Sequence, residues 1–336
     1  NDALKFTKKI IAAGPAKNDD YLNNSIDNHV MISVDDVEEL RKIKEINKPC
    51  KVLLRISDLL GKISRFGINL NQIDLCLDII SNSLIQLEGF SFHINNYSLN
   101  DRVEAINEVI ELTESKNIDI NFIDIGGGIP TNYCSKDDYY NFLKKNNKEM
   151  YFKEHFITDY YPYYSRTADE NALDYILKKV YKKLNKNKIE IIIEPGRSLL
   201  KNVGVSIYEV QYMKHLYNGE NILVTNGNIN CLSEQWFNSD YLIEPKLISK
   251  NNNQSNTIFA SIAGNLCLEQ DMITWRKIKF DNIPERGDLL VYYNTAGYQM
   301  DSNESEFHKI PLVKKYVVKI IDDRYVVEED KKYDCK

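Results

Sequence analysis

The feature that most constrains the fold is an alternation, repeated along the first two hundred residues, of a short apolar run, a loop and an amphipathic stretch. Short apolar, β-branched runs fit strands buried on both faces, and amphipathic stretches fit helices that cover a sheet. The expected strands are 10–13, 30–34, 52–56, 87–93, 121–125 and 189–194. The expected helices are 35–46, 73–80, 99–115 and 172–184. This order predicts parallel strands joined by helices, which is an α/β fold.

The pattern changes after about Leu200 to short alternating segments separated by turn residues. Alternation of this kind is typical of strands with one buried face. The expected strands are 206–212, 222–225, 257–262, 278–280, 289–293 and 316–322. We therefore expect two domains, an α/β domain over residues 1–202 and a β-domain over residues 203–336.

Composition excludes several classes of protein. The 336 residues carry 43 Lys and Arg against 49 Asp and Glu, a net charge of −6, which disfavours a nucleic-acid partner. No apolar run approaches the roughly 20 residues of a membrane helix, so no membrane association is expected. The six cysteines form no CxxC pair, which disfavours a zinc site or a disulfide framework and favours the cytoplasm.

Three glycines, Gly126, Gly127 and Gly128, directly follow the strand expected at 121–125. Their bare backbone N–H groups could approach an anion such as phosphate, or they could form a turn that needs positive φ. The sequence leaves both readings open. The run is not GxGxxG, which disfavours a dinucleotide fingerprint.

Two further expected strands end in polar groups. The strand 189–194 ends in Glu194 and is followed by Gly196 and Arg197, which could clamp a phosphate or simply close a loop. The strand 87–93 ends in His93, a residue that by itself is as consistent with packing as with chemistry. Because parallel strands of a barrel end at one edge, these groups predict a common site there.

Six motifs, taken in order, resemble those of the fold-type III pyridoxal-phosphate decarboxylases, the family that includes the ornithine, arginine and diaminopimelate decarboxylases. The motifs are SRFG (64–67), SFH (91–93), DIGGG (124–128), EPGR (194–197), GNLC with a following Asp (264–271) and GDLL with a following AGY (287–298). The resemblance implies an alanine-racemase-like (β/α)8 TIM barrel followed by a C-terminal β-domain. It also implies pyridoxal 5'-phosphate as cofactor and a homodimer with shared active sites.

The resemblance assigns cofactor-binding roles residue by residue. The matching positions are Arg55, His93, Gly126, Gly127, Gly128, Glu194, Gly196, Arg197 and Tyr298. It places His93 on the pyridine ring and Glu194 at the ring nitrogen. A carboxylate there favours the pyridinium, a strong electron sink, whereas related racemases carry an arginine. Decarboxylation of an amino acid or a derivative, by way of an external aldimine and a quinonoid, is therefore favoured.

The resemblance also implies that Cys267 reaches the partner subunit's site and handles a proton at the reacting carbon, with His93 as the second catalytic residue. The decarboxylases have an acid directly after this cysteine, facing the substrate's distal amine, and this chain has Leu268. Asp271 is the candidate substrate contact instead, with Glu269 as the alternative. The family's His-x-Gly-Ser is also altered, which puts Ser98 in doubt as a phosphate ligand.

The family's Schiff-base lysine has no match here. Segment 10–17, including Lys17, resembles the third barrel strand, so we expect two strands and that lysine to lie upstream of Asn1. The insertion 131–169 is rich in tyrosine and suggests a lid on the substrate side. Its tyrosines include Tyr139, Tyr140, Tyr160, Tyr161, Tyr163 and Tyr164.

Three alternatives remain. The chain could be a non-catalytic homologue that binds a regulatory partner, a racemase, or a decarboxylase of a large biosynthetic intermediate such as a siderophore precursor, which Leu268 would suit. The joint presence of five residues favours an enzyme, because a binding protein does not need them: His93, Glu194, Arg197, Cys267 and Tyr298.

Overall fold

The computed structural model describes residues 3–157, 161, 163–232, 243–249, 256–300, 305 and 307–330. The chain divides into two compact units, residues 1–130 with 166–198 and residues 131–165 with 199–336. The domain division expected between residues 202 and 203 stays a prediction. The structure adds that segment 131–165, which precedes that boundary in the sequence, packs with the second unit.

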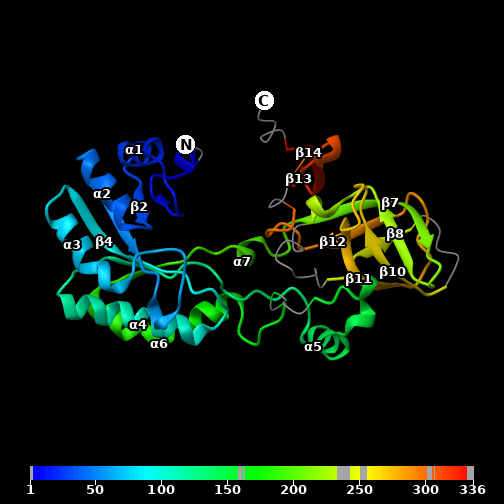
Figure 1. Cartoon of the computed structure of the whole chain (residues 1–336), viewed down its shortest axis with the longest axis horizontal. Helices are drawn as coiled ribbons and strands as arrows, with labels where there is room; N and C mark the ends of the chain where they lie inside the picture. Colours follow the sequence, from blue (N-terminus) through cyan, green and yellow to red (C-terminus); the bar gives the residue numbers. More distant parts are fainter. Residues whose placement is uncertain are drawn as a thin grey trace. The chain divides into compact units, whose positions relative to one another are not determined.

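The described residues of the first unit contain a curled sheet of six parallel strands in chain order, from β1 to β6 (Figure 1). The strands are β1 Ile11–Ala12, β2 Met31–Val34, β3 Cys50–Arg55, β4 Ile85–Ser91, β5 Phe122–Asp124 and β6 Glu190–Ile192. Strands β2, β3 and β4 lie within the sheet, and most of their residues are buried on both faces, as the apolar runs predict. All six strands expected in this part of the chain are confirmed, and so is the α/β barrel class.

Helices connect these strands. They are α1 Asp19–Asp27, α2 Val37–Ile46, α3 Ile73–Ser81, α4 Leu99–Lys116 and α6 Asp169–Asn187, with short 3-10 helices at Leu59–Gly61 and Leu70–Gln72. A 3-10 helix at Ala3–Lys5 precedes β1, and α7 Arg197–Leu200 follows β6. The four expected helices are confirmed, and α4 and α6 pack against each other (Figure 1). Helix α1 was missed because few of its nine residues are apolar. It is nevertheless capped by Asn18, whose side chain accepts from the Tyr21 N–H, and it buries Leu22 and Ile26.

The second unit is built on β-strands. They are β7 Val205–His215, β8 Asn221–Thr225, β9 Lys246–Ile248, β10 Ile258–Ala263, β11 Met272–Phe280, β12 Leu289–Tyr293, β13 Tyr316–Ile321 and β14 Arg324–Glu329. In the described residues the first six form one sheet in the order β11-β10-β8-β7-β12-β9, and β13 pairs with β14 in a hairpin. Only β8 and β10 pair in parallel within the sheet. The C-terminal β-domain class is confirmed. Strand β9 was missed because it has only three residues, and β14 because three of its six residues are charged.

Segment 131–165 joins the second unit through aromatic contacts. It contains α5 Lys136–Lys145 and 3-10 helices at Lys148–Met150 and Phe152–Glu154. The Phe152 ring stacks on Trp275 with centroids 6.3 Å apart. The backbone of Tyr151 forms an isolated antiparallel β-bridge with that of Arg276. Burial of these rings against β11 accounts for the grouping.

The tyrosines of the expected lid fall in different places. Tyr161 and Tyr163 are buried and pack edge to face, with ring centroids 5.4 Å apart, so they contribute to the core of the segment. Tyr140 is exposed, and Tyr160 lies outside the described residues. The lid stays a prediction. Among the described residues, no helix has both the length and the apolar character required to cross a membrane.

Candidate functional site

Charged and polar residues lie at or just beyond the carboxyl ends of five neighbouring strands in the first unit. Asp35 follows β2, Arg55 ends β3, His93 follows β4, Asp124 ends β5 and Glu194 follows β6. Parallel strands direct these ends to one edge of the sheet, which is where barrel enzymes place their sites. The structure therefore brings the two polar strand ends singled out in the sequence, His93 and Glu194, to one edge together with Arg55, and it adds Asp35 and Asp124.

An ion pair fixes Arg55 at this edge. Its Nη1 lies 3.1 Å from Asp35 Oδ1, and both side chains are largely buried. The guanidinium carbon also lies 4.6 Å from the centroid of the Phe66 ring. These two contacts hold a positive charge at the mouth of the barrel. Asp35 could have been noticed in the sequence, because it is an acid at the end of an expected strand.

The three-glycine loop has the positive φ values considered for it, and its backbone lies close to neighbouring residues. Gly126 and Gly128 have φ of +65° and +77°, in the left-handed region that favours glycine. A Cβ on Gly126 would lie 2.8 Å from His93 Nδ1, and one on Gly127 would lie 2.7 Å from the Glu194 carbonyl oxygen. The loop thus leaves no room for side chains at these positions.

Two backbone donors near this loop remain open. No described residue accepts a hydrogen bond from the N–H of Gly128 or of Gly196, whereas the Glu194 N–H donates to Gly126 O at 3.0 Å. The Glu194 to Gly126 bond holds the two loops side by side. Arg197 follows as the first residue of α7. The arrangement is consistent with anion binding between adjacent loops.

The His93 ring is held in a neutral form. The Gly127 N–H donates to its Nδ1 at 3.4 Å, so the ring proton of the neutral form lies on Nε2. Partial desolvation lowers the pKa of His93, and the positive charges of Arg102 and Arg55 lower it further. The ring is therefore an uncharged flat surface near neutral pH.

Asp124 is a buried acid beneath the glycine loop. Only 2% of the residue is exposed, and its Oδ1 accepts from the Gly126 N–H at 2.9 Å. Burial raises the pKa of Asp124 to about 6, and the nearby Glu194 charge raises it as well, while the hydrogen bond and Arg55 oppose the shift. Asp124 belongs to the DIGGG motif, but no local feature of the sequence distinguished it from the rest of the strand.

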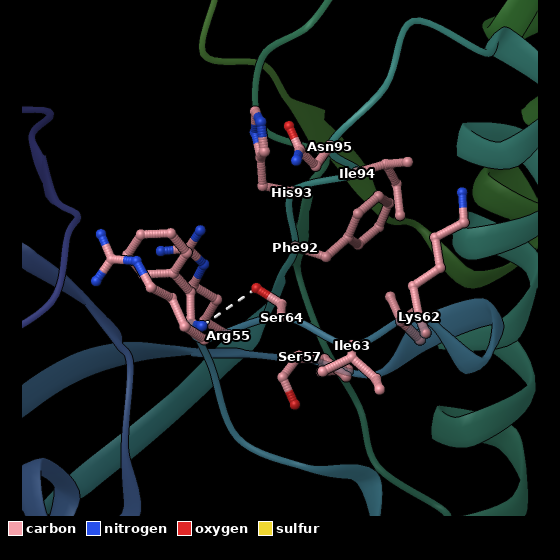
Figure 2. Close-up of a pocket in the computed structure, with 13 residues that line it drawn as sticks. Arg55, Ser57, Lys62, Ile63, Ser64, Phe92, His93, Ile94 and Asn95 are labelled. Carbon is pink, nitrogen blue, oxygen red and sulfur yellow. Dashed lines mark hydrogen bonds between the residues drawn. The ribbon is translucent and has the colours of Figure 1, made fainter. Parts of the chain in front are cut away.

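A cavity of about 690 Å³ opens at this edge, between the loops that follow β3 and β4. Figure 2 shows Arg55 and Lys62 on opposite sides of it, with His93 between them at the top of the view. Arg65 also lines it, and none of the described residues that line it is acidic. The size suits a small-molecule ligand, and the cations suit one that carries an anionic group.

Ser98 and Lys17 are engaged in structural contacts. Ser98 caps α4, where its Oγ accepts from the Asp101 N–H at 3.2 Å. Lys17 is buried, and its Nζ lies 2.8 Å from Glu39 Oε1 and donates to the carbonyl oxygens of Gly14 and Ser33. Ser98 thus serves the helix, and Lys17 is saturated with acceptors.

The remaining predicted residues belong to the second unit. Cys267 is exposed in the turn before β11, and Tyr298 is 46% exposed with a left-handed φ of +72°, a strained conformation that is often found at functional sites. Asp271 is buried, and it accepts from Ile229 N–H at 2.7 Å and from Leu266 N–H at 2.6 Å, so it shapes the loop that carries Cys267. The approach of these residues to those of the first unit stays a prediction.

Comparison with known proteins places this geometry in a family context. The family model for the pyridoxal-dependent decarboxylase, pyridoxal binding domain, matches residues 3–201. The uncharacterized protein y4yA of Sinorhizobium fredii is 30% identical over 328 residues, which cover 92% of this chain and 72% of that protein. Diaminopimelate decarboxylase of Aquifex aeolicus is 25% identical over 352 residues, covering 96% of this chain and 75% of the relative.

Solved structures share the fold. Diaminopimelate decarboxylase from M. jannaschii, in complex with L-lysine, matches with a TM-score of 0.73 and 19% identity over 94% of this chain and 70% of that one. The arginine decarboxylase of Paramecium bursaria Chlorella virus matches with a TM-score of 0.69 and 20% identity over 89% of this chain and 74% of that one. At these identities the likeness concerns the fold.

Proposed function

This chain belongs to the pyridoxal-dependent decarboxylase family, and on that premise we propose that it removes CO2 from an amino acid or an amino-acid-derived substrate. The cofactor of the family is pyridoxal phosphate. The observation that carries the proposal is the convergence of Arg55, His93, the glycine loop and Glu194 on one edge of a parallel sheet. The proposal includes a cytoplasmic homodimer with shared active sites.

The residues at this edge fit pyridoxal phosphate. The open N–H groups of Gly128 and Gly196, with the Arg197 guanidinium, suit a phosphate dianion. The neutral His93 ring suits stacking on a flat heteroaromatic ring, and Glu194, an exposed carboxylate, suits a protonated ring nitrogen. When bound, the cofactor supplies an electron sink for the carbanion that forms as CO2 leaves.

The protein's own side chains then have distinct tasks. Glu194 holds a proton at the ring nitrogen by favouring its charged form. His93 covers one face of the ring and keeps water from it. Arg55, fixed by Asp35, presents a positive charge at the mouth of the barrel. Cys267 delivers the proton that replaces the carboxylate, across the dimer.

The cavity bears on the class of substrate. Because no acidic side chain of the described residues lines it and Leu268 replaces the family's acid, we propose a substrate whose far end is anionic or uncharged instead of a free amine. This also accommodates the decarboxylation of a larger intermediate. Glu194 favours decarboxylation over racemisation, since its carboxylate strengthens the electron sink.

The test combines cofactor binding and CO2 release. Purified full-length protein is titrated with pyridoxal phosphate, followed by the change in cofactor absorbance, and is then assayed for CO2 from a panel of amino acids. Glu194→Gln should bind the cofactor but lose on the order of 100-fold in kcat. Glu190→Gln, an exposed acid on β6, is the matched control and should behave like the wild type. Absence of cofactor binding, or of CO2 from every substrate, contradicts the proposal.

A further inference from the structure

Arg102, on α4, is a fully buried arginine that the sequence did not single out. Its Nη2 donates to the carbonyl oxygens of Ile94 at 3.2 Å, Asn96 at 2.8 Å and Gly127 at 2.9 Å, and its Nη1 donates to Ser98 O at 3.0 Å. All four acceptors are neutral backbone groups. The side chain thereby ties the loop after β4 to the glycine loop after β5.

No carboxylate of the described residues contacts the Arg102 guanidinium directly, although Asp101 attracts it from a distance. In the described part of the chain it forms no ion pair, and its Nε has no hydrogen-bond partner. The neighbouring Asp101 is instead paired with Lys62. Burial of a cation is costly unless an opposite charge compensates it, as Glu39 does for the buried Lys17. A buried guanidinium that contacts only neutral carbonyl groups, and whose neighbouring acid is already paired with Lys62, therefore calls for an explanation.

The position of the guanidinium supplies one. A Cβ on Gly128 would lie 2.2 Å from Arg102 Nη2, so the guanidinium occupies the space behind the loop where a side chain would stand. The Gly128 N–H donates to no described residue. The charge also reaches the neighbouring site, because it contributes to the lowered pKa of His93.

We infer that Arg102 is a positioning residue for the phosphate of the cofactor. It fixes the backbone of the glycine loop from behind, and its positive charge is balanced when a phosphate dianion binds to that loop. The inference rests on the proposed function, since it needs a phosphate-bearing ligand at this edge. In this arrangement the Arg102 guanidinium does not contact the phosphate, and its charge attracts the phosphate across the backbone of the glycine loop.

The experiment separates charge from scaffold by comparing pyridoxal phosphate with pyridoxal, which lacks the phosphate. Arg102→Gln keeps N–H donors but removes the charge, and Arg102→Lys keeps the charge. Arg41→Gln, on an exposed face of α2, is the matched control. Dissociation constants for both ligands, and competition by inorganic phosphate, are measured for the four proteins.

We expect Arg102→Gln to raise the dissociation constant of pyridoxal phosphate about 10-fold or more, while that of pyridoxal changes by less than about 2-fold. Arg102→Lys should stay within about 3-fold of the wild type for both ligands. Equal weakening of both ligands in Arg102→Gln, or no change in either, overturns the inference. If Arg102→Gln does not fold, Arg102→Lys decides: a retained preference for the phosphate-bearing ligand supports the inference, and equal loss of both ligands overturns it. A wild type that binds neither ligand rejects the proposed function and the inference with it.

Discussion

Two buried aspartates, one in each unit, show how the fold around a residue changes its chemistry. Asp124 in the first unit accepts one backbone N–H and lies near Glu194 and Arg55, and its pKa rises to about 6. Asp271 in the second unit accepts two backbone N–H groups and holds a turn. Both acids were within motifs noticed in the sequence, yet only Asp124 shares its surroundings with other polar strand ends.

Strand direction explains the difference. In the first unit every strand is parallel, so polar residues at the carboxyl ends gather at one edge and interact. In the second unit the strands of the sheet are mostly antiparallel, so successive turns lie at opposite ends. A buried acid in the second unit, such as Asp271, therefore accepts hydrogen bonds from the backbone of nearby turns, whereas a buried acid in the first unit, such as Asp124, lies within a cluster of charged residues.

The largest expected effect concerns the buried Lys17–Glu39 ion pair of the first unit, and it tests whether the stability of the protein depends on both partners. Lys17→Met should reduce the free energy of unfolding by about 3–5 kcal/mol, because it leaves the buried Glu39 carboxylate without its cation. Urea unfolding followed by circular dichroism measures this. The double variant Lys17→Met with Glu39→Leu should recover part of the loss. A single variant as stable as the wild type contradicts the role given to the pair.

The second prediction concerns the pH dependence of Asp124. Its pKa is raised from 3.8 to about 6 on folding, so the folded protein retains a proton that the unfolded chain releases. Stability should therefore fall as pH rises from about 4 to about 6, by up to about 3 kcal/mol, and Asp124→Asn should remove this part of the dependence. Urea midpoints between pH 4 and pH 7 provide the test, and an unchanged profile in the variant rules out the raised pKa.

The smallest effect is expected in the second unit. Asp271→Asn should destabilise the protein by about 2 kcal/mol, since the amide cannot accept from both the Ile229 and Leu266 N–H groups. Asp281→Asn, at an exposed carboxylate on the same unit, serves as the control and should match the wild type. Calorimetry or urea unfolding is sufficient. A loss of CO2 release without a loss of stability would instead favour the substrate role expected for Asp271.

The sequence was sufficient where the signal is local and insufficient where it depends on a distant partner. All six strands of the first unit follow from apolar, β-branched runs, and the polar strand ends converge because the strands are parallel. Arg102 was missed because a lone arginine in a helix carries no local sign of the four carbonyls that it binds. The grouping of segment 131–165 was missed because it depends on contacts such as Phe152 with Trp275, far away in the chain.

The strand order of the first sheet has a consequence for how the protein folds. Each strand pairs with its predecessor in the chain, and such short-range pairings form quickly because little loop entropy is lost. The pairing of β5 with β6 spans a much longer stretch of chain. The connection between these two strands contains segment 131–165, which packs with the second unit. We expect this sheet to assemble by sequential addition up to β5. The arrival of β6 is then the step at which the folding of the two units becomes coupled.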